Sequence, residues 1–149
     1  MKRINQYQKL FAVEKTYTLK ELKSTYRKLV KEWHPDKFQD GDALKEEAAI
    51  KSREIIDAYH FLVSMAAETK EANLDAYTTT TITSGIEDYQ HQGRTLEITF
   101  LDGSTYEYFG VDKKLFIKMN QSDKLNRFAK RNIFNSFPYR KSKRDLVKA

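Results

Sequence analysis

The residues best suited to chemistry are His34, Pro35 and Asp36, which directly follow a basic, amphipathic stretch. Pro35 has no backbone N–H, and its ring disfavours the helical conformation for the residue before it. A helix that reaches this point is therefore expected to end at about Trp33. The imidazole of His34 and the carboxylate of Asp36 then flank a ring of fixed φ, as a compact polar group that can hydrogen-bond another molecule.

The stretch before this motif predicts the helix that positions it. Thr18 and Glu21 have the spacing of a capping box, so the helix is expected to begin there. Its apolar side chains recur at helical spacing and predict one buried stripe, formed by Leu19, Leu22, Tyr26, Leu29, Val30 and Trp33. The opposite side is basic and carries Lys20, Lys23, Arg27, Lys28 and Lys31.

Further helices are predicted on both sides of this one. An opening helix is indicated by Tyr7, Leu10, Phe11 and Val13, and 38–42 has the composition of a loop. A longer helix, 43–64, has apolar positions that can face the buried stripe, namely Leu44, Ala48, Ile55, Ala58, Tyr59 and Leu62. Two helices joined by a short loop predict an antiparallel hairpin with the His-Pro-Asp motif at its tip. A fourth helical segment, 68–77, is expected to face inward with Ala72, Leu74 and Tyr77.

The order of these parts resembles the J-domain of DnaJ-family co-chaperones. The basic helix and the His-Pro-Asp motif are followed by Ile55-Ile56-Asp57-Ala58-Tyr59-His60-Phe61-Leu62, which fits the family's third-helix pattern without a gap. The resemblance covers about the first half of the chain. It departs at Ser52, where an aromatic residue is common, and in the fourth segment, which lacks the usual Arg-Ala-Ala.

The resemblance implies binding to a heat-shock ATPase chaperone of the DnaK type and stimulation of its ATP hydrolysis. The residues that it implies in this contact are His34, Pro35, Asp36, Lys23, Tyr26, Arg27 and Lys28. Taken alone, the tripeptide is better explained as a helix stop with a solvated carboxylate, and only its combination with the other parts favours the J-domain interpretation. The Gly/Phe-rich linker and cysteine zinc centre found in many J-proteins are missing, since the chain has five glycines and no cysteine.

The second half predicts a small antiparallel β-sheet covered by two α-helices. Four threonines at 78–81 are interpreted as a short junction, followed by strands at 82–89, 95–101 and 104–109. Asp112 and Ser122 are each expected to cap a helix. The fold class is therefore α+β, with two small domains at 1–77 and 78–149.

This half is similar to the KTSC domain, named for its occurrence at the C-terminus of some lysyl-tRNA synthetases. The similarity covers about 82–141 and rests on Leu96, Ile98, Phe100, Gly103, Tyr106-Glu107-Tyr108, Val111, Ser122, Phe128, Ile133 and Phe137-Pro138-Tyr139-Arg140. Asp112 stands where a proline is often found, and Lys124 where a glycine is usual. The domain has no settled activity, and nucleic-acid binding has been suggested for it.

The role of Tyr106 and Tyr108 depends on strand register. A two-residue turn at Asp102-Gly103 would direct both rings away from Leu96, where they could stack on nucleic-acid bases. A turn one residue longer, with a bulge at Gly103, would place them on the Leu96 side, in the core. Strand tyrosines more often bury their rings, which favours the second register.

Positive charge is concentrated in the second half. Lys and Arg outnumber Asp and Glu by 14 to 13 through Tyr77 (+1) and by 13 to 8 from Thr78 onward (+5), which together give the net charge of +6. Side chains that could hold RNA phosphates are Lys124, Arg127, Lys130, Arg131, Arg140 and Lys141, with Lys143, Arg144 and Lys148 in the tail. The aromatics Phe134, Phe137 and Tyr139 could stack bases. The alternative is a solvated helix and a frayed basic tail.

We therefore expect a cytoplasmic co-chaperone whose C-terminal domain targets it to a client or to RNA. The alternative is an RNA- or ribosome-associated protein with a secondary or inactive J-domain. No nucleophile–base pair or phosphate loop indicates an enzyme or a cofactor, and His34, His60 and His91 lack metal-ligand spacing. No apolar run approaches the ~20 residues of a membrane span, and the absence of cysteine agrees with a reducing compartment.

Overall fold

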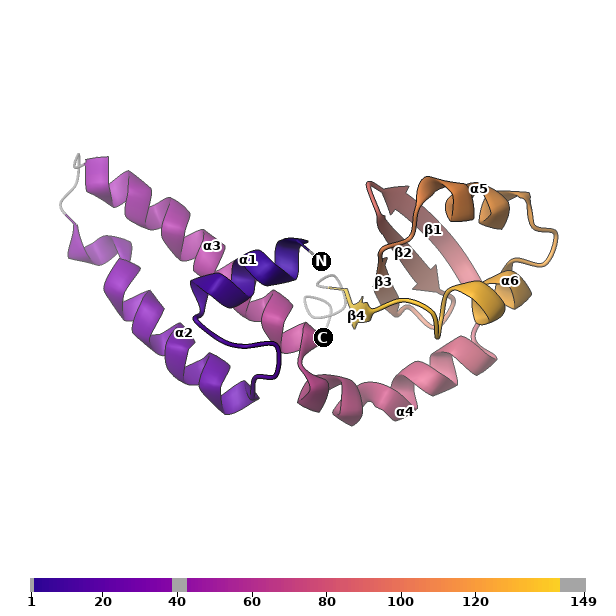
Figure 1. Cartoon of the computed structure of the whole chain (residues 1–149), viewed down its shortest axis with the longest axis horizontal. Coiled ribbons are helices and arrows are strands. Elements are labelled where there is room, and N and C mark those ends of the chain that lie inside the picture. Colours follow the sequence, from indigo (N-terminus) through magenta and orange to yellow (C-terminus); the bar gives the residue numbers. More distant parts are fainter. Residues whose placement is uncertain (1, 39–42, 143–149) are drawn as a thin grey trace. The chain divides into compact units, whose positions relative to one another are not determined.

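A computed structural model describes residues 2–38 and 43–142 (Figure 1). The chain divides into two compact units, Met1–Lys70 and Glu71–Ala149. The first consists of helices and the second holds an antiparallel sheet with helices, so the predicted α+β class is confirmed. Residues 71–77, expected in the first domain, belong to the second unit.

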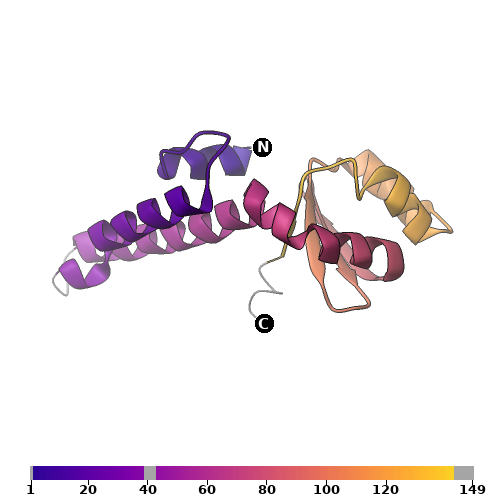
Figure 2. The same cartoon turned by 90° about the horizontal axis from the view of Figure 1, so that it is seen from below.

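The first unit is built around two antiparallel helices, α2 and α3, which lie side by side in Figures 1 and 2. The shorter α1 packs against α3. This arrangement confirms the predicted hairpin, while the predicted loop residues 39–42 lie outside the described part of the chain. The elements are α1 (Lys2–Leu10), α2 (Leu19–Trp33), the 3-10 turn η1 (Pro35–Lys37) and α3 (Ala43–Met65).

The core of the first unit joins the apolar stripe of α2 to α3. Leu22 is fully buried against Ile55, and the ring of Tyr26 stacks on Tyr59 with 4.1 Å between ring centroids. Leu44 was expected to face this core but is 52% exposed. That prediction is wrong for Leu44, which lies in the first turn of α3, whereas Ala48, one turn later, is fully buried.

Helix α4 (Ala67–Thr83) includes the threonines at 78–81, so the predicted junction is wrong. The hydroxyl of Thr81 donates to the carbonyl oxygen of Tyr77 at 3.0 Å, and that of Thr83 donates to Thr79 at 2.6 Å. Threonine hydroxyls can satisfy the preceding helical turn in this way. Tertiary packing, which buries Thr81, then overrides the strand preference of these β-branched residues.

The fourth predicted helical segment exists, but only part of it faces inward. Tyr77 is 4% exposed and belongs to the core of the second unit. Ala72 is exposed and Leu74 is 51% exposed, so the prediction was wrong for these two residues. Neither residue belongs to a hydrophobic core cluster of the described chain, and the two clusters share no residue.

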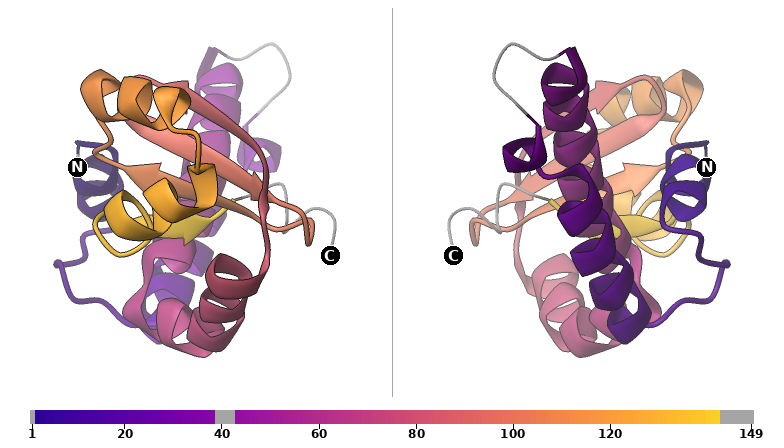
Figure 3. Two further views of the ribbon diagram at one scale, coloured as in Figure 1. Left: turned by 90° about the vertical axis from the view of Figure 1, so that its right-hand side faces the viewer. Right: turned by 90° about the vertical axis from the view of Figure 1, so that its left-hand side faces the viewer.

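The second unit contains a four-stranded antiparallel sheet in the order β1-β2-β3-β4. Figure 3 shows α5 and α6 over one face of this sheet. Met119 of α5 and Ala129 of α6 pack in one cluster with Leu96 and Ile98 of β2, which confirms the predicted sheet under two helices. The elements are β1 (Ile86–Gln92), β2 (Thr95–Phe100), β3 (Thr105–Phe109), α5 (Lys113–Gln121), α6 (Leu125–Asn132) and β4 (Tyr139–Lys141).

The β2–β3 hairpin has the longer of the two predicted turns. The backbone N–H of Phe100 donates to the carbonyl of Ser104 at 2.8 Å, so three residues, 101–103, form the loop. Gly103 has a φ of 91°, a conformation that glycine adopts without a Cβ clash. The loop therefore has the form of a turn followed by a glycine bulge.

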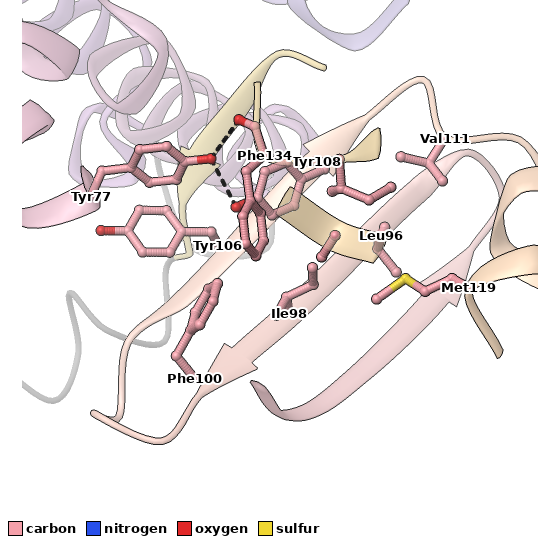
Figure 4. Packing of buried hydrophobic residues seen from close by; sticks show 11 residues of the cluster. Tyr77, Leu96, Ile98, Phe100, Tyr106, Tyr108, Val111, Met119 and Phe134 are labelled. Atoms are coloured by element: carbon pink, nitrogen blue, oxygen red, sulfur yellow. Dashed lines mark hydrogen bonds between the residues drawn. The ribbon is translucent and has the colours of Figure 1, made fainter. Parts of the chain in front are cut away.

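This turn directs Tyr106 and Tyr108 into the core. Tyr108 lies opposite Leu96 and Tyr106 opposite Ile98, so all four side chains share one face of the sheet. Tyr106 is 2% exposed and Tyr108 is 0% exposed. Figure 4 shows both rings within the buried cluster beside Tyr77. The core interpretation of the two tyrosines is confirmed.

Two of the three predicted helix caps are present. The hydroxyl of Thr18 accepts the N–H of Glu21 at 3.1 Å, and the carboxylate of Asp112 accepts the N–H of Leu115 at 2.8 Å. Ser122 was expected to cap the last helix but is instead the C-terminal cap of α5. Helix α6 begins two residues later than that cap would require, without a side-chain hydrogen bond at its N-terminus.

Two strands differ from prediction. The first begins at Ile86 rather than Ile82, because helix α4 continues to Thr83 and two further residues connect it to the strand. Strand β4 was not predicted, since the three residues 139–141 are too few to show an alternating pattern. Its backbone pairing with β3 is a long-range contact that local sequence does not signal.

Candidate functional site

The chain leaves α2 at His34, whose backbone is extended, with φ −64° and ψ 129°. Pro35 then begins one turn of 3-10 helix, in which the N–H of Lys37 donates to the carbonyl of His34 at 3.1 Å. The side chains of His34 and Asp36 are 51% and 88% exposed. The helix ends at Trp33 as predicted, and both polar groups are accessible to a partner.

The imidazole of His34 is oriented by Asp36. Its Nδ1 accepts the backbone N–H of Asp36 at 3.2 Å, and an acceptor nitrogen carries no proton. The neutral ring therefore holds its proton on Nε2, where it can be donated to a partner. If Nδ1 were protonated, the ring would instead pair with Oδ2 of Asp36, which lies 3.5 Å away.

The basic face of α2 leads to this motif. Lys23, Arg27 and Lys28 are exposed, as predicted. Tyr26, placed with them in the expected contact, is half-buried and contributes to the core through its stack on Tyr59. The site therefore combines three exposed cations with a hydrogen-bond donor and a carboxylate at the end of the helix.

The tyrosines proposed to bind RNA have a different role. The hydroxyl of Tyr77 lies 3.0 Å from that of Tyr108 and donates to the carbonyl of Phe134 at 2.7 Å (Figure 4). Burial raises the pKa of both hydroxyls. Tyr106 and Tyr108 are not available for base stacking, because the register of the hairpin directs both into the core.

Comparison with known families assigns both parts of the chain. The DnaJ domain model matches residues 6–72, which include the end of α1, all of α2, the His34–Asp36 segment and α3. The KTSC domain model matches residues 83–137, which include β1 to β3, α5 and α6. The chain carries a DnaJ domain followed by a KTSC domain.

Curated proteins named "Chaperone protein DnaJ" are similar to the first domain. The protein of Hydrogenobacter thermophilus is 42% identical over 59 residues, which are 40% of this chain and 15% of the relative. Those of Thermoplasma acidophilum and Thermotoga maritima are 39% and 38% identical over 56 residues, which are 38% of this chain and 14% of each relative. The chain thus matches only a small part of the length of these relatives.

Arg140, also proposed to bind RNA, is engaged in an ion pair within the second unit. It lies just beyond the matched KTSC residues. Its side chain is 6% exposed, and its Nη2 lies 2.8 Å from Oε1 of Glu107, whose side chain is 13% exposed. These residues pair across β3 and β4. The prediction is wrong because Arg140 is a buried ion-pair partner rather than a surface cation.

The other predicted cations are accessible. Lys124, Arg127, Lys130 and Arg131 are exposed on or beside α6, and Lys141 is half-buried. Every aromatic side chain in the described part of the second unit is buried or half-buried, including Phe134, Phe137 and Tyr139. Helix α6 therefore offers charge without an exposed ring beside it. The tail residues Lys143, Arg144 and Lys148 lie outside the described residues.

Sequence reasoning missed two polar contacts that hold the ends of α2. Glu68 accepts the N–H of Leu19 at 3.1 Å, at the start of the helix. Ser52 donates to the carbonyl of Trp33 at 2.8 Å, at its end. Both partners are distant in sequence, so no local pattern signals them. The only available signal was the departure of Ser52 from the aromatic residue common in J-domains.

Residues 2–38 and 43–142 show no group of three or more His, Asp or Glu side chains that could hold a metal ion. In the same ranges, no helix is both long enough and apolar enough to cross a membrane.

Proposed function

We propose that the protein is a co-chaperone that binds a heat-shock ATPase chaperone of the DnaK type and stimulates its ATP hydrolysis through His34, Pro35 and Asp36. The observation that carries this proposal is the exposed histidine–aspartate pair fixed at the end of a basic helix in a DnaJ domain. The protein performs no bond-breaking step of its own and acts in the cytoplasm.

The positive charge on α2 favours the first encounter with the chaperone. Lys23, Arg27 and Lys28 are exposed on one helix and attract an acidic surface. Such complementarity speeds association and orients the partners more than it tightens the final complex. The helix therefore brings its C-terminal end to the chaperone in a defined orientation.

The motif provides the effect on the ATPase. In this proposal, Nε2–H of His34 donates to a switch element of the chaperone, and the carboxylate of Asp36 accepts from it. The ring of Pro35 keeps the two groups at a fixed spacing. The chaperone shifts toward its hydrolysing state only by the difference in affinity of its two states for this surface.

Steady-state ATP hydrolysis by a DnaK-type chaperone tests the proposal. The full chain should stimulate hydrolysis, and His34→Gln should remove the stimulation. His60→Gln is the matched control, because His60 is an exposed histidine of the same domain, on α3 and outside the site. Absent stimulation by the unaltered chain, or full stimulation by His34→Gln, would contradict the proposal.

We propose a second function, in which the KTSC domain targets the protein by binding RNA. The exposed cations Arg127, Lys130 and Arg131 on α6 favour this. Because the described aromatic rings of this domain are not exposed, contact would be with phosphates, without base stacking.

Binding of a short RNA to the full chain tests this second role. Phosphate contacts predict an affinity that falls steeply with salt and little dependence on sequence. Arg127→Ala with Arg131→Ala should weaken binding, while Lys113→Ala with Lys114→Ala on α5 removes equal charge elsewhere in the same domain. Salt-insensitive binding, or equal loss from both pairs, would argue against a site on α6.

A further inference from the structure

The carbonyl oxygen of Trp33 has lost its helical donor. In a continuing α-helix it would accept the N–H of Lys37. Here the N–H of Lys37 donates to His34 instead, because Pro35 diverts the chain into a 3-10 turn. The last carbonyl before the His-Pro-Asp motif therefore needs a donor from outside α2.

Ser52 supplies that donor. Its hydroxyl, on helix α3, lies 2.8 Å from the carbonyl oxygen of Trp33, and the bond is partly buried. Leaving a carbonyl unpaired in such a place would destabilise the folded protein. The bond joins the peptide unit directly before His34 to the neighbouring helix.

The contact fixes a backbone position that side-chain packing alone leaves adjustable. The indole of Trp33 is half-buried against the core of the first unit, which holds the side chain but not the carbonyl. The peptide plane at Trp33 sets the direction in which the chain leaves the helix. We propose that Ser52 is a positioning residue, which orients the His34–Asp36 segment for its effect on the chaperone ATPase. This inference rests on the proposed function.

Titration of a DnaK-type chaperone with the full chain measures the role of Ser52. Ser52→Ala should lower the maximal stimulation about fivefold, a factor typical of one hydrogen bond. The half-saturating concentration should not change, because the cations of α2 that guide binding are retained. Ser52→Thr keeps a hydroxyl and should restore the maximum.

Ser64→Ala is the matched control. Its hydroxyl also donates to a backbone carbonyl on α3, that of Phe61 at 2.6 Å, but away from the end of α2. A variant that only loses folded protein raises the half-saturating concentration and still reaches the full maximum. A lowered maximum in Ser52→Ala alone thus supports positioning, whereas an unchanged maximum overturns it.

A measurement without the chaperone separates this inference from the proposed function. Amide hydrogen exchange at Asp36 and Lys37 should be about fivefold faster in Ser52→Ala than in Ser64→Ala, because these amides bond within the segment that Ser52 anchors. Unchanged exchange would overturn the positioning role even if stimulation is observed. If the unaltered chain fails to stimulate, the proposed function fails, and the exchange rates still decide whether Ser52 orders the segment.

Discussion

Nδ1 of His34 lies 3.2 Å from the backbone nitrogen and 3.5 Å from the carboxylate oxygen Oδ2 of Asp36. The two residues therefore order each other, while Asp36 leaves most of its carboxylate to solvent. This arrangement separates two properties of Asp36. Its backbone N–H orients the imidazole, and its charge remains available to a partner.

Asp36→Asn should remove the charge and keep the backbone hydrogen bond. We expect maximal stimulation of the chaperone ATPase to fall roughly tenfold, because hydrogen bonds to charged groups contribute about 1.5–3 kcal/mol. The free energy of unfolding, measured by thermal denaturation, should change by less than about 0.5 kcal/mol, since the side chain is exposed. Asp75→Asn, at an exposed aspartate of α4, is the control. Full stimulation by Asp36→Asn would show that the charge is not used.

Charge reversal on α2 should affect binding rather than the maximal rate. Lys23→Glu with Arg27→Glu is expected to raise the half-saturating concentration about tenfold at low salt, with the difference shrinking as salt screens the charges. Lys2→Glu with Lys9→Glu makes the same change of charge on α1. The same shift from both pairs would point to net charge instead of a local surface.

Arg140→Met should destabilise the second unit by about 3 kcal/mol, because it leaves the carboxylate of Glu107 buried without its partner. Replacing both residues with Met should cost less than the single change. Urea unfolding followed by circular dichroism measures both. The single tryptophan of the chain, Trp33, belongs to the first unit, so its fluorescence transition should stay unchanged. If Arg140→Met left the free energy of unfolding of the second unit unchanged, the structural role of the pair would be contradicted.

Alkaline pH should weaken the first unit through Tyr17. Its hydroxyl donates to the carbonyl of Leu62 at 2.8 Å, and burial raises its pKa from 10.0 to about 12. The unfolded chain thus loses this proton first as pH rises. The stability that depends on neutral Tyr17 is complete below pH 10 and is lost as pH rises through about 12.

Tyr17→Phe should therefore flatten the fall in unfolding free energy between pH 10 and pH 12, measured by the fluorescence of Trp33. The variant should also be less stable at neutral pH, because the carbonyl of Leu62 loses its donor. An identical slope in both proteins would exclude Tyr17 as the titrating group.

The first unit could be predicted almost completely, because its helices are determined by residues that are close together in the sequence. The cap at Thr18 and the stop at Pro35 bound α2, and the periodic apolar positions identify its buried side. The accessibility of His34 and Asp36 then follows from the break in the helix. Ser52 could not be identified in the same way, because its value depends on which carbonyl lies beside it.

The second unit was less predictable because its contacts are between distant residues. The threonines at 78–81 favour a strand by type, and only their packing makes them helical. Arg140 appears as a surface cation until β4 pairs with β3 and brings Glu107 beside it. For Tyr108, both faces were compatible with the residue types, and the conformation of Gly103 decides between them.

Within residues 2–38 and 43–142, the two hydrophobic clusters have no residue in common. Replacing the core side chains of the sheet-containing half therefore removes none of the core side chains of the helical half. If the proposed function holds, a lineage that exchanges the sheet-containing half would keep the surface that engages the ATPase chaperone and acquire a new target for it. Under the proposed function, separate cores would let the domain that selects the target change independently of the domain that engages the chaperone.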